Sequence, residues 1–128
     1  MRFSLRNLVF LAALVGATAV TALADERAEK RQADFQQQVR PFLTQYCFDC
    51  HAGESPDGEL RLDVLKEAGE IATTRRKTWK KVHDKIFGHV MPPEDAEQPT
   101  KEQRERISAW LQGALDDYDC SGPVNPGR

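Results

Sequence analysis

The chain has 128 residues, enough for one small domain, and its 18 Lys and Arg against 20 Asp and Glu give a formal net charge of −2. This mildly acidic balance argues against a nucleic-acid partner, because domains that bind nucleic acid carry an excess of positive charge. A chain this short buries a modest core, so a covalent staple, a metal or a cofactor would add to its stability.

Residues 1–24 are typical of a secretory signal peptide. Two arginines precede an apolar run over 8–20, and an A-x-A-like cleavage site ends at Ala24. The run is short for a membrane span and no second run follows it, which leaves an uncleaved N-terminal anchor as the alternative. Cleavage removes the two arginines, so the mature chain keeps 16 Lys and Arg against 20 Asp and Glu, a net charge of −4. We expect it in the periplasm or another extracytoplasmic compartment.

Glu26 to Tyr46 has the periodicity of an amphipathic helix. Its apolar residues recur at three- and four-residue steps, at Phe35, Val39, Phe42, Leu43 and Tyr46. Pro41 lies inside this pattern and has no backbone N–H, so we expect a kink or a new turn there.

The signature Cys47-x-x-Cys50-His51 follows this helix directly and matches C-x-x-C-H, the pattern of covalent haem attachment. Its two thiols are about one helical turn apart, so each can form a thioether with one vinyl group of the same haem. His51 then supplies the proximal imidazole to the iron. Haem is attached to thiols outside the cytoplasm, which agrees with the export signal.

Two other interpretations of these cysteines stay open. A redox-active disulfide between Cys47 and Cys50 would be expected in a strand-rich, thioredoxin-like chain, and this chain shows no such pattern. Structural zinc would need two further ligands, without the usual zinc spacing, from His51, His83, His89 and Cys120.

The middle of the chain alternates between loops and helices. Residues 52–59 are rich in turn signals, 60–67 could form a short helix, and 69–74 have no clear period. Thr78 to Phe87 is predicted as an amphipathic helix that ends at Gly88.

Met91-Pro92-Pro93 cannot be helical and is predicted to be a stiff loop. Met91 is the sole methionine once the signal peptide is removed, which makes it the first candidate for the second axial ligand of the iron. His83 and His89 are the alternatives, although His83 lies on an apolar helix face. A His/Met pair would raise the reduction potential above that of a bis-His haem.

Thr100 and Gln103 form a capping box that begins a final helix, which runs to about Asp116. Its apolar face is made of Ile107, Trp110, Leu111, Ala114 and Leu115, and extends to Tyr118. No strand is predicted. The expected fold class is all-α, with three to four helices around one covalently bound haem.

The order of helix, haem signature, Met91-Pro92 loop and terminal helix resembles the class I cytochrome c fold. In that fold the first and last helices cross and pack through aromatic residues, and 35–46 with 107–115 would be that pair. That resemblance covers roughly residues 33–118. The chain is more similar still to the cytochrome-c-like N-terminal regions of large exported planctomycete proteins. The matching stretches are Val39-Arg40-Pro41-Phe42-Leu43, Tyr46-Cys47-Phe48-Asp49-Cys50-His51, Gly58-Glu59-Leu60-Arg61-Leu62-Asp63, Val90-Met91-Pro92-Pro93 and Trp110-Leu111.

This resemblance implies a cytochrome c-like domain over 25–118, with haem at Cys47, Cys50 and His51 and with Met91 as distal ligand. It implies no substrate. Residues 119–128 resemble the junction that leads into further domains in those proteins. Two interpretations remain, a short paralogue or a truncated gene product whose partner domains are encoded separately.

We therefore expect an exported mono-haem cytochrome that transfers single electrons and is not an enzyme, since no pair of catalytic residues stands out. The alternatives are a five-coordinate haem that binds a gas or a peroxide, and a haem module of a larger redox assembly. The stretch Arg75–Lys85 carries a local net charge of +5 and is either a docking face for a redox partner or a solvated helix face.

Overall fold

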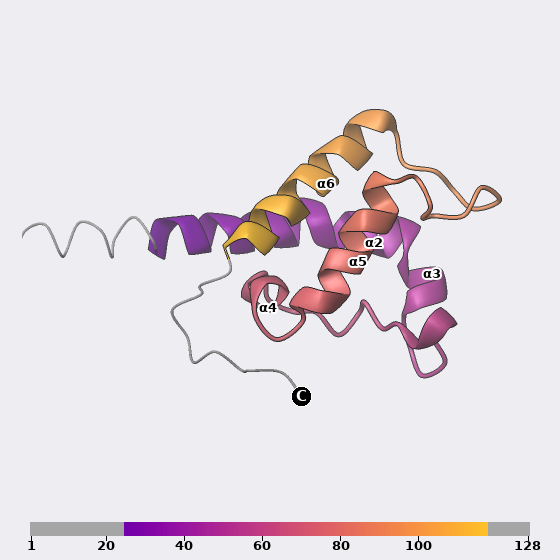
Figure 1. The fold of residues 1–128 in the computed structure, drawn as a ribbon, viewed down its shortest axis with the longest axis horizontal. Helices are drawn as coiled ribbons and strands as arrows, with labels where there is room; N and C mark the ends of the chain where they lie inside the picture. Colours follow the sequence, from indigo (N-terminus) through magenta and orange to yellow (C-terminus); the bar gives the residue numbers. More distant parts are fainter. Residues whose placement is uncertain (1–24, 118–128) are drawn as a thin grey trace, which may run out of the picture. The chain divides into compact units, whose positions relative to one another are not determined.

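The computed structural model describes residues 25–117, and these residues form helices and loops without a strand, as the all-α prediction requires (Figure 1). The predicted signal peptide and tail, with Tyr118 and Cys120, lie outside the described residues. The chain divides into two units, Met1–Arg31 and Gln32–Arg128. Of the first unit, residues 25–31 are described, and they are helical. The second unit holds the core and every predicted ligand.

The first predicted helix contains one irregular turn. Residues 25–34 are α-helical, Phe35–Val39 form a π-helical turn (η1), and α2 spans Arg40–Tyr46. The backbone N–H of Arg40 donates to the carbonyl of Phe35, five residues back, and Pro41 stands in the first turn of α2. Proline and π turns are both established causes of irregular helices, so the expected disturbance at Pro41 is confirmed and begins one turn earlier.

Residues 60–67 do not form a helix, so that prediction is wrong. After α3 (Phe48–His51) and a 3₁₀ turn (η2, Asp57–Glu59), the chain runs irregularly to residue 68. Several of its backbone groups bond to side chains of the first helix. Arg40 donates to the carbonyl of Leu65 at 3.2 Å, and Gln32 accepts from the backbone N–H of Ala68 at 2.8 Å. Leu62 and Leu65 are nevertheless buried, so the apolar spacing reports burial and not helix.

Three helices complete the described part of the chain. They are α4 (Gly69–Ala72), α5 (Arg76–Phe87) and α6 (Lys101–Asp116). The short α4 lies where the sequence showed no period, whereas α5 and α6 agree with prediction within two residues. Both hydrogen bonds of the predicted capping box are present. The Thr100 hydroxyl accepts from the backbone N–H of Gln103 at 3.2 Å, and the side-chain Oε1 of Gln103 accepts from the backbone N–H of Thr100 at 2.8 Å.

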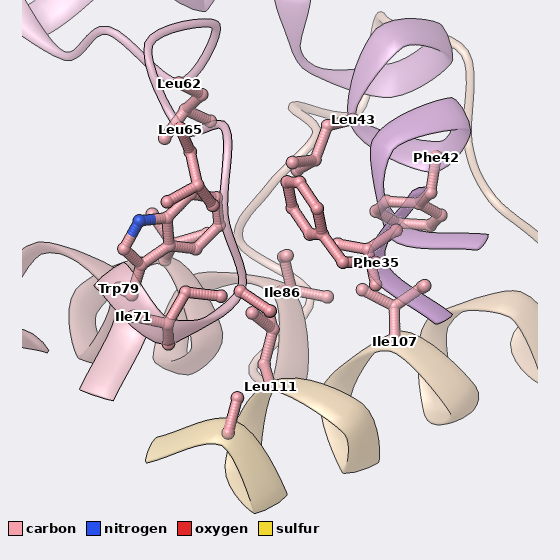
Figure 2. Packing of buried hydrophobic residues seen from close by; sticks show 14 of the residues in the cluster. Phe35, Phe42, Leu43, Leu62, Leu65, Ile71, Trp79, Ile86, Ile107 and Leu111 are labelled. Atoms are coloured by element: carbon pink, nitrogen blue, oxygen red, sulfur yellow. The ribbon is translucent and has the colours of Figure 1, made fainter. Parts of the chain in front are cut away.

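One apolar core joins these elements, and α6 packs against both α5 and α4 (Figure 2). The rings of Phe35 and Trp110 stack with their centroids 6.0 Å apart, which confirms the predicted aromatic contact between the first and last helices. Figure 2 shows Leu111 of α6 projecting toward Ile71 and Ile86. The largest fully buried side chains are Trp79, Phe35, Leu43, Leu65, Ile71, Leu111 and Val39.

Replacement of Leu111 tests this core. Leu111→Ala removes a fully buried side chain and leaves a cavity, so we expect the free energy of unfolding to fall by about 2–5 kcal/mol. Denaturant titration followed by far-UV circular dichroism measures the change. The exposed neighbour Gln112→Ala is the control, with an expected change within about 0.5 kcal/mol. Equal effects in the two variants would contradict this account of the core.

Candidate functional site

The Cys47–His51 signature occupies a single tight turn at the end of the first helix. The N–H of Cys47 still donates to the carbonyl of Leu43 at 2.9 Å, and the N–H of His51 donates to the carbonyl of Cys47 at 2.8 Å. Cys47 is half-buried against the core and Cys50 is exposed, and both are free thiols. The helical turn of α3 thus places the second thiol and the imidazole one turn after the first thiol.

Two contacts with the following segment fix His51. Its Nδ1 lies 3.1 Å from the backbone carbonyl of Asp57, and its own carbonyl accepts from the N–H of Leu62 at 2.8 Å. A carbonyl oxygen can only accept, so Nδ1 carries the proton and the lone pair is on Nε2. This is the arrangement that orients a metal-binding histidine in proteins. His51 therefore offers Nε2 as a ligand from a ring whose tautomer is set by the backbone.

One hollow brings together all four predicted haem-binding residues, Cys47, Cys50, His51 and Met91. The first three come from the end of α2 and from α3, and Met91 comes from the loop after α5, at least forty positions later in the sequence. Most of the remaining wall is apolar or aromatic. It is made of Phe42, Gln45, Tyr46, Asp49, Ile86, Pro92, Pro93, Ala96 and Glu97.

His83 and His89 do not line this hollow. Both line a separate groove between α5 and α6, together with Phe87 and Ser108. The His83 ring stacks on that of Phe87 with centroids 5.8 Å apart, and its Nδ1 lies 3.3 Å from a carboxylate oxygen of Asp84. Of the three candidate distal ligands, Met91 is the one that shares a hollow with the signature.

The loop that carries Met91 is held by a residue that the sequence analysis missed. Arg104 of α6 is only 5% exposed, and its Nη1 donates to the carbonyls of Met91 at 2.6 Å and of Ile86 at 3.0 Å. The sequence does contain a signal for this role, because Arg104 is a charged residue on the buried face of α6. It stands three and four positions before the buried Ile107 and Ser108. A charged residue on a buried stripe predicts a specific partner.

Burial and charge act on the two thiols in the same direction. Burial, followed by the neighbouring Cys50 thiol, raises the pKa of Cys47 to about 12. Desolvation, followed by the negative charges of Asp57, Asp49 and Asp95, raises the pKa of Cys50. Both groups therefore stay protonated at neutral pH. Thiols of disulfide oxidoreductases have lowered pKa values, so these surroundings argue against a redox-active disulfide.

The zinc interpretation finds no second pair of ligands. Within residues 25–117, no three His, Cys, Asp or Glu side chains are grouped so that they could hold a metal ion. Cys120 lies outside these residues.

Within residues 25–117, no helix combines the length and the apolar character that crossing a bilayer requires.

Comparison with known families singles out the same part of the chain. Residues 47–95 match the planctomycete cytochrome C family. The match begins at Cys47 and ends four residues after Met91, so it contains all four predicted haem-binding residues. It confirms the predicted resemblance to planctomycete cytochromes, a family whose name implies haem c as the cofactor. No curated protein and no solved structure matches the chain.

The donor set fits the haem c of planctomycete cytochrome C. Two free thiols one turn apart would provide the two thioether positions, His51 would present Nε2, and Met91, which lines the same hollow, would present a thioether. The aromatic and apolar wall suits a large, flat, mostly apolar group.

Gly58 controls the backbone that orients His51. Its φ is +61° and that of the next residue, Glu59, is +56°, so the chain turns left-handed directly after the carbonyl that accepts from His51. Gly58→Val places a β-branched side chain in this conformation, and we expect it to lower the free energy of unfolding by about 1–2 kcal/mol. Gly58→Asn is the matched control, because asparagine tolerates a left-handed backbone and should lower stability less. Denaturant titration of both variants measures the difference, and equal losses would contradict the role of φ.

Proposed function

We propose that this chain is an exported c-type cytochrome that carries one haem, attached through Cys47 and Cys50, and transfers single electrons. In this proposal His51 and Met91 are the axial ligands. The observation that carries it is that Met91, from the loop after α5, lines the same hollow as the complete attachment signature. The bound haem would supply one-electron iron chemistry.

The residues around the hollow have separate roles in this proposal. The two thioethers would hold the group in one orientation, while the bond from His51 to the Asp57 carbonyl strengthens the imidazole as a donor. Phe42 and Ile86 line the wall and exclude water, which favours the iron state of lower charge. Met91, a weak donor, favours the same ferrous state.

Electron transfer is favoured over catalysis by the number of ligands. With His51 and Met91 both bound, no coordination position would remain for a gas, a peroxide or another substrate. The main chain of Met91 is held on both sides, through its N–H to Lys85 and its carbonyl to Arg104. A five-coordinate haem would require the Met91 side chain to turn away from the iron. Attachment of haem to thiols and the signal-like residues 1–24 support an extracytoplasmic location.

The visible spectrum of the full chain, matured with a haem-attachment system, tests the proposal. We expect haem that survives denaturation, sharp low-spin bands when reduced, and the far-red band of a ferric iron–methionine bond. Met91→Ala should remove that band, give a high-spin spectrum, and lower the reduction potential by roughly 100 mV or more, within the ~0.8 V range that axial ligands span.

His83→Ala and His89→Ala are the matched controls and should keep the far-red band, because both residues line the other groove. Loss of the low-spin spectrum in either histidine variant, with Met91→Ala unchanged, would assign the ligand to that histidine. A colourless wild-type protein from cells that mature other c-type cytochromes would refute the haem assignment, and zinc analysis would follow.

We also propose that the basic stretch of α5 guides a redox partner with an acidic surface. Within it, Lys80 pairs with Asp84 at 2.9 Å, while Lys77, Lys81 and Lys85 are exposed. The carbonyl of Lys85 accepts from the N–H of Met91 at 3.1 Å, so the stretch ends beside the Met91 loop. Charge near the site of electron entry acts mainly on the rate of encounter.

Reduction and oxidation rates with small anionic and cationic reagents, measured against ionic strength, test this docking face. The anionic reagent should react faster with the wild type, and this advantage should fall with salt. Replacement of Lys77, Lys81 and Lys85 by Ser should slow the anionic reagent several-fold, on the order expected for electrostatic steering. Replacement of Lys66, Lys101 and Arg106 by Ser removes equal charge elsewhere and is the control. Faster reaction with the cationic reagent would contradict the proposal and assign the face to Asp49, Asp57 and Asp95.

A further inference from the structure

Arg104 is a buried cation whose three hydrogen-bond acceptors are all amide oxygens. Its Nη1 donates to the carbonyls of Ile86 and Met91, and its Nη2 donates to the side-chain oxygen of Gln98 at 3.1 Å. A guanidinium loses much hydration when it is buried, so such a site persists only where its donors are satisfied. The planar fork of arginine can serve several acceptors at fixed angles, which an aliphatic side chain cannot do.

These acceptors belong to separate segments that meet at one point. Ile86 is in the last turn of α5, Met91 follows three residues after the turn at Gly88, and Gln98 precedes the cap of α6. Arg104 therefore connects α6 to the end of α5 and to both halves of the intervening loop. The contact of 2.6 Å with Met91 is short, as charge-assisted hydrogen bonds are.

Gln98 extends the same arrangement along the loop. Its side-chain N–H₂ donates to the carbonyl of Pro93 at 2.6 Å and lies 3.4 Å from that of Pro92. Prolines have no backbone N–H with which to anchor themselves, so their carbonyls are the groups by which this loop can be held. The consecutive carbonyls of Met91, Pro92 and Pro93 thus all face donors from Arg104 or Gln98.

We propose that Arg104 is the positioning residue for the distal ligand, acting through the main chain of Met91. The inference rests on the proposed ligation of iron by Met91. A thioether is a weak donor, so its occupancy depends on how little freedom the loop loses when the bond forms. Arg104 holds the loop in place before the bond forms, and Gln98 braces the guanidinium and the two prolines.

The test compares Arg104→Met with Arg106→Met in the full, haem-loaded chain. Methionine keeps much of the length of the side chain and removes every donor, and the exposed Arg106 lies on the same helix two positions away. Arg104→Met should retain the attached haem and the helical circular dichroism, but the far-red iron–methionine band should weaken. Added imidazole should bind the ferric iron of this variant about tenfold more tightly or better, because a less firmly held Met91 is easier to displace. A tenfold change in affinity corresponds to about 1.4 kcal/mol. Arg104→Lys, which keeps the charge and some donors, should fall between Arg104→Met and the wild type.

Hydrogen exchange gives a readout that does not depend on the iron. The amides of Val90 and Met91 both donate to the carbonyl of Lys85, at 2.9 and 3.1 Å, and should exchange faster in Arg104→Met than in Arg106→Met. A wild type that lacks the far-red band would refute ligation by Met91, while faster exchange would still support the clamp. Wild-type imidazole affinity together with wild-type exchange in Arg104→Met would overturn the inference.

If Arg104→Met does not fold, Gln98→Ala replaces it. This variant removes the brace and leaves the cation and the core in place, so it should show the same spectral and exchange changes at smaller size. Equal changes in Arg106→Met would attribute the effect to loss of charge from α6 and would also overturn the inference.

Discussion

The packing of α5 against α6 decides where Met91 lies, and the rest of the site depends on that position. Ile86 takes part in this packing, as a member of the buried core, and also lines the hollow that contains the attachment signature. The apolar face of α5 therefore sets the distance between the two halves of the site. A substitution in the core would therefore also displace the candidate ligands, because close-packed interiors transmit strain.

The parts of the fold that the sequence predicts well depend on neighbours in the chain. The signature, the two prolines after Met91, the capping box of α6 and the end of α5 at Gly88 each follow from the local chemistry of a few residues. Their positions in the structure agree with prediction. The candidate ligands could be named for the same reason, since thiol spacing and the single methionine after residue 24 need no tertiary information.

The parts that could not be predicted depend on partners far away in the sequence. Residues 60–67 have the apolar spacing of a helix, yet Gln32 and Arg40 of the first helix bond to the backbone of this region and hold it open. Arg104 is another example, because two of its three partners are backbone carbonyls 13 and 18 positions away, and backbone carbonyls carry no sequence signal. The local propensity for helix is overridden where a residue far away in the sequence forms a hydrogen bond with the backbone.

The clamp on the Met91 loop also bears on how fast an electron could move. If Met91 is bound to iron, the gain or loss of one electron changes the charge of the iron beside the Met91 loop. The carbonyls of this loop already accept hydrogen bonds from fixed donors. Dipoles that are held by bonds from Arg104 and Gln98 cannot turn far to follow that charge. The nuclear rearrangement that accompanies each transfer would then be small, and so would its contribution to the activation barrier.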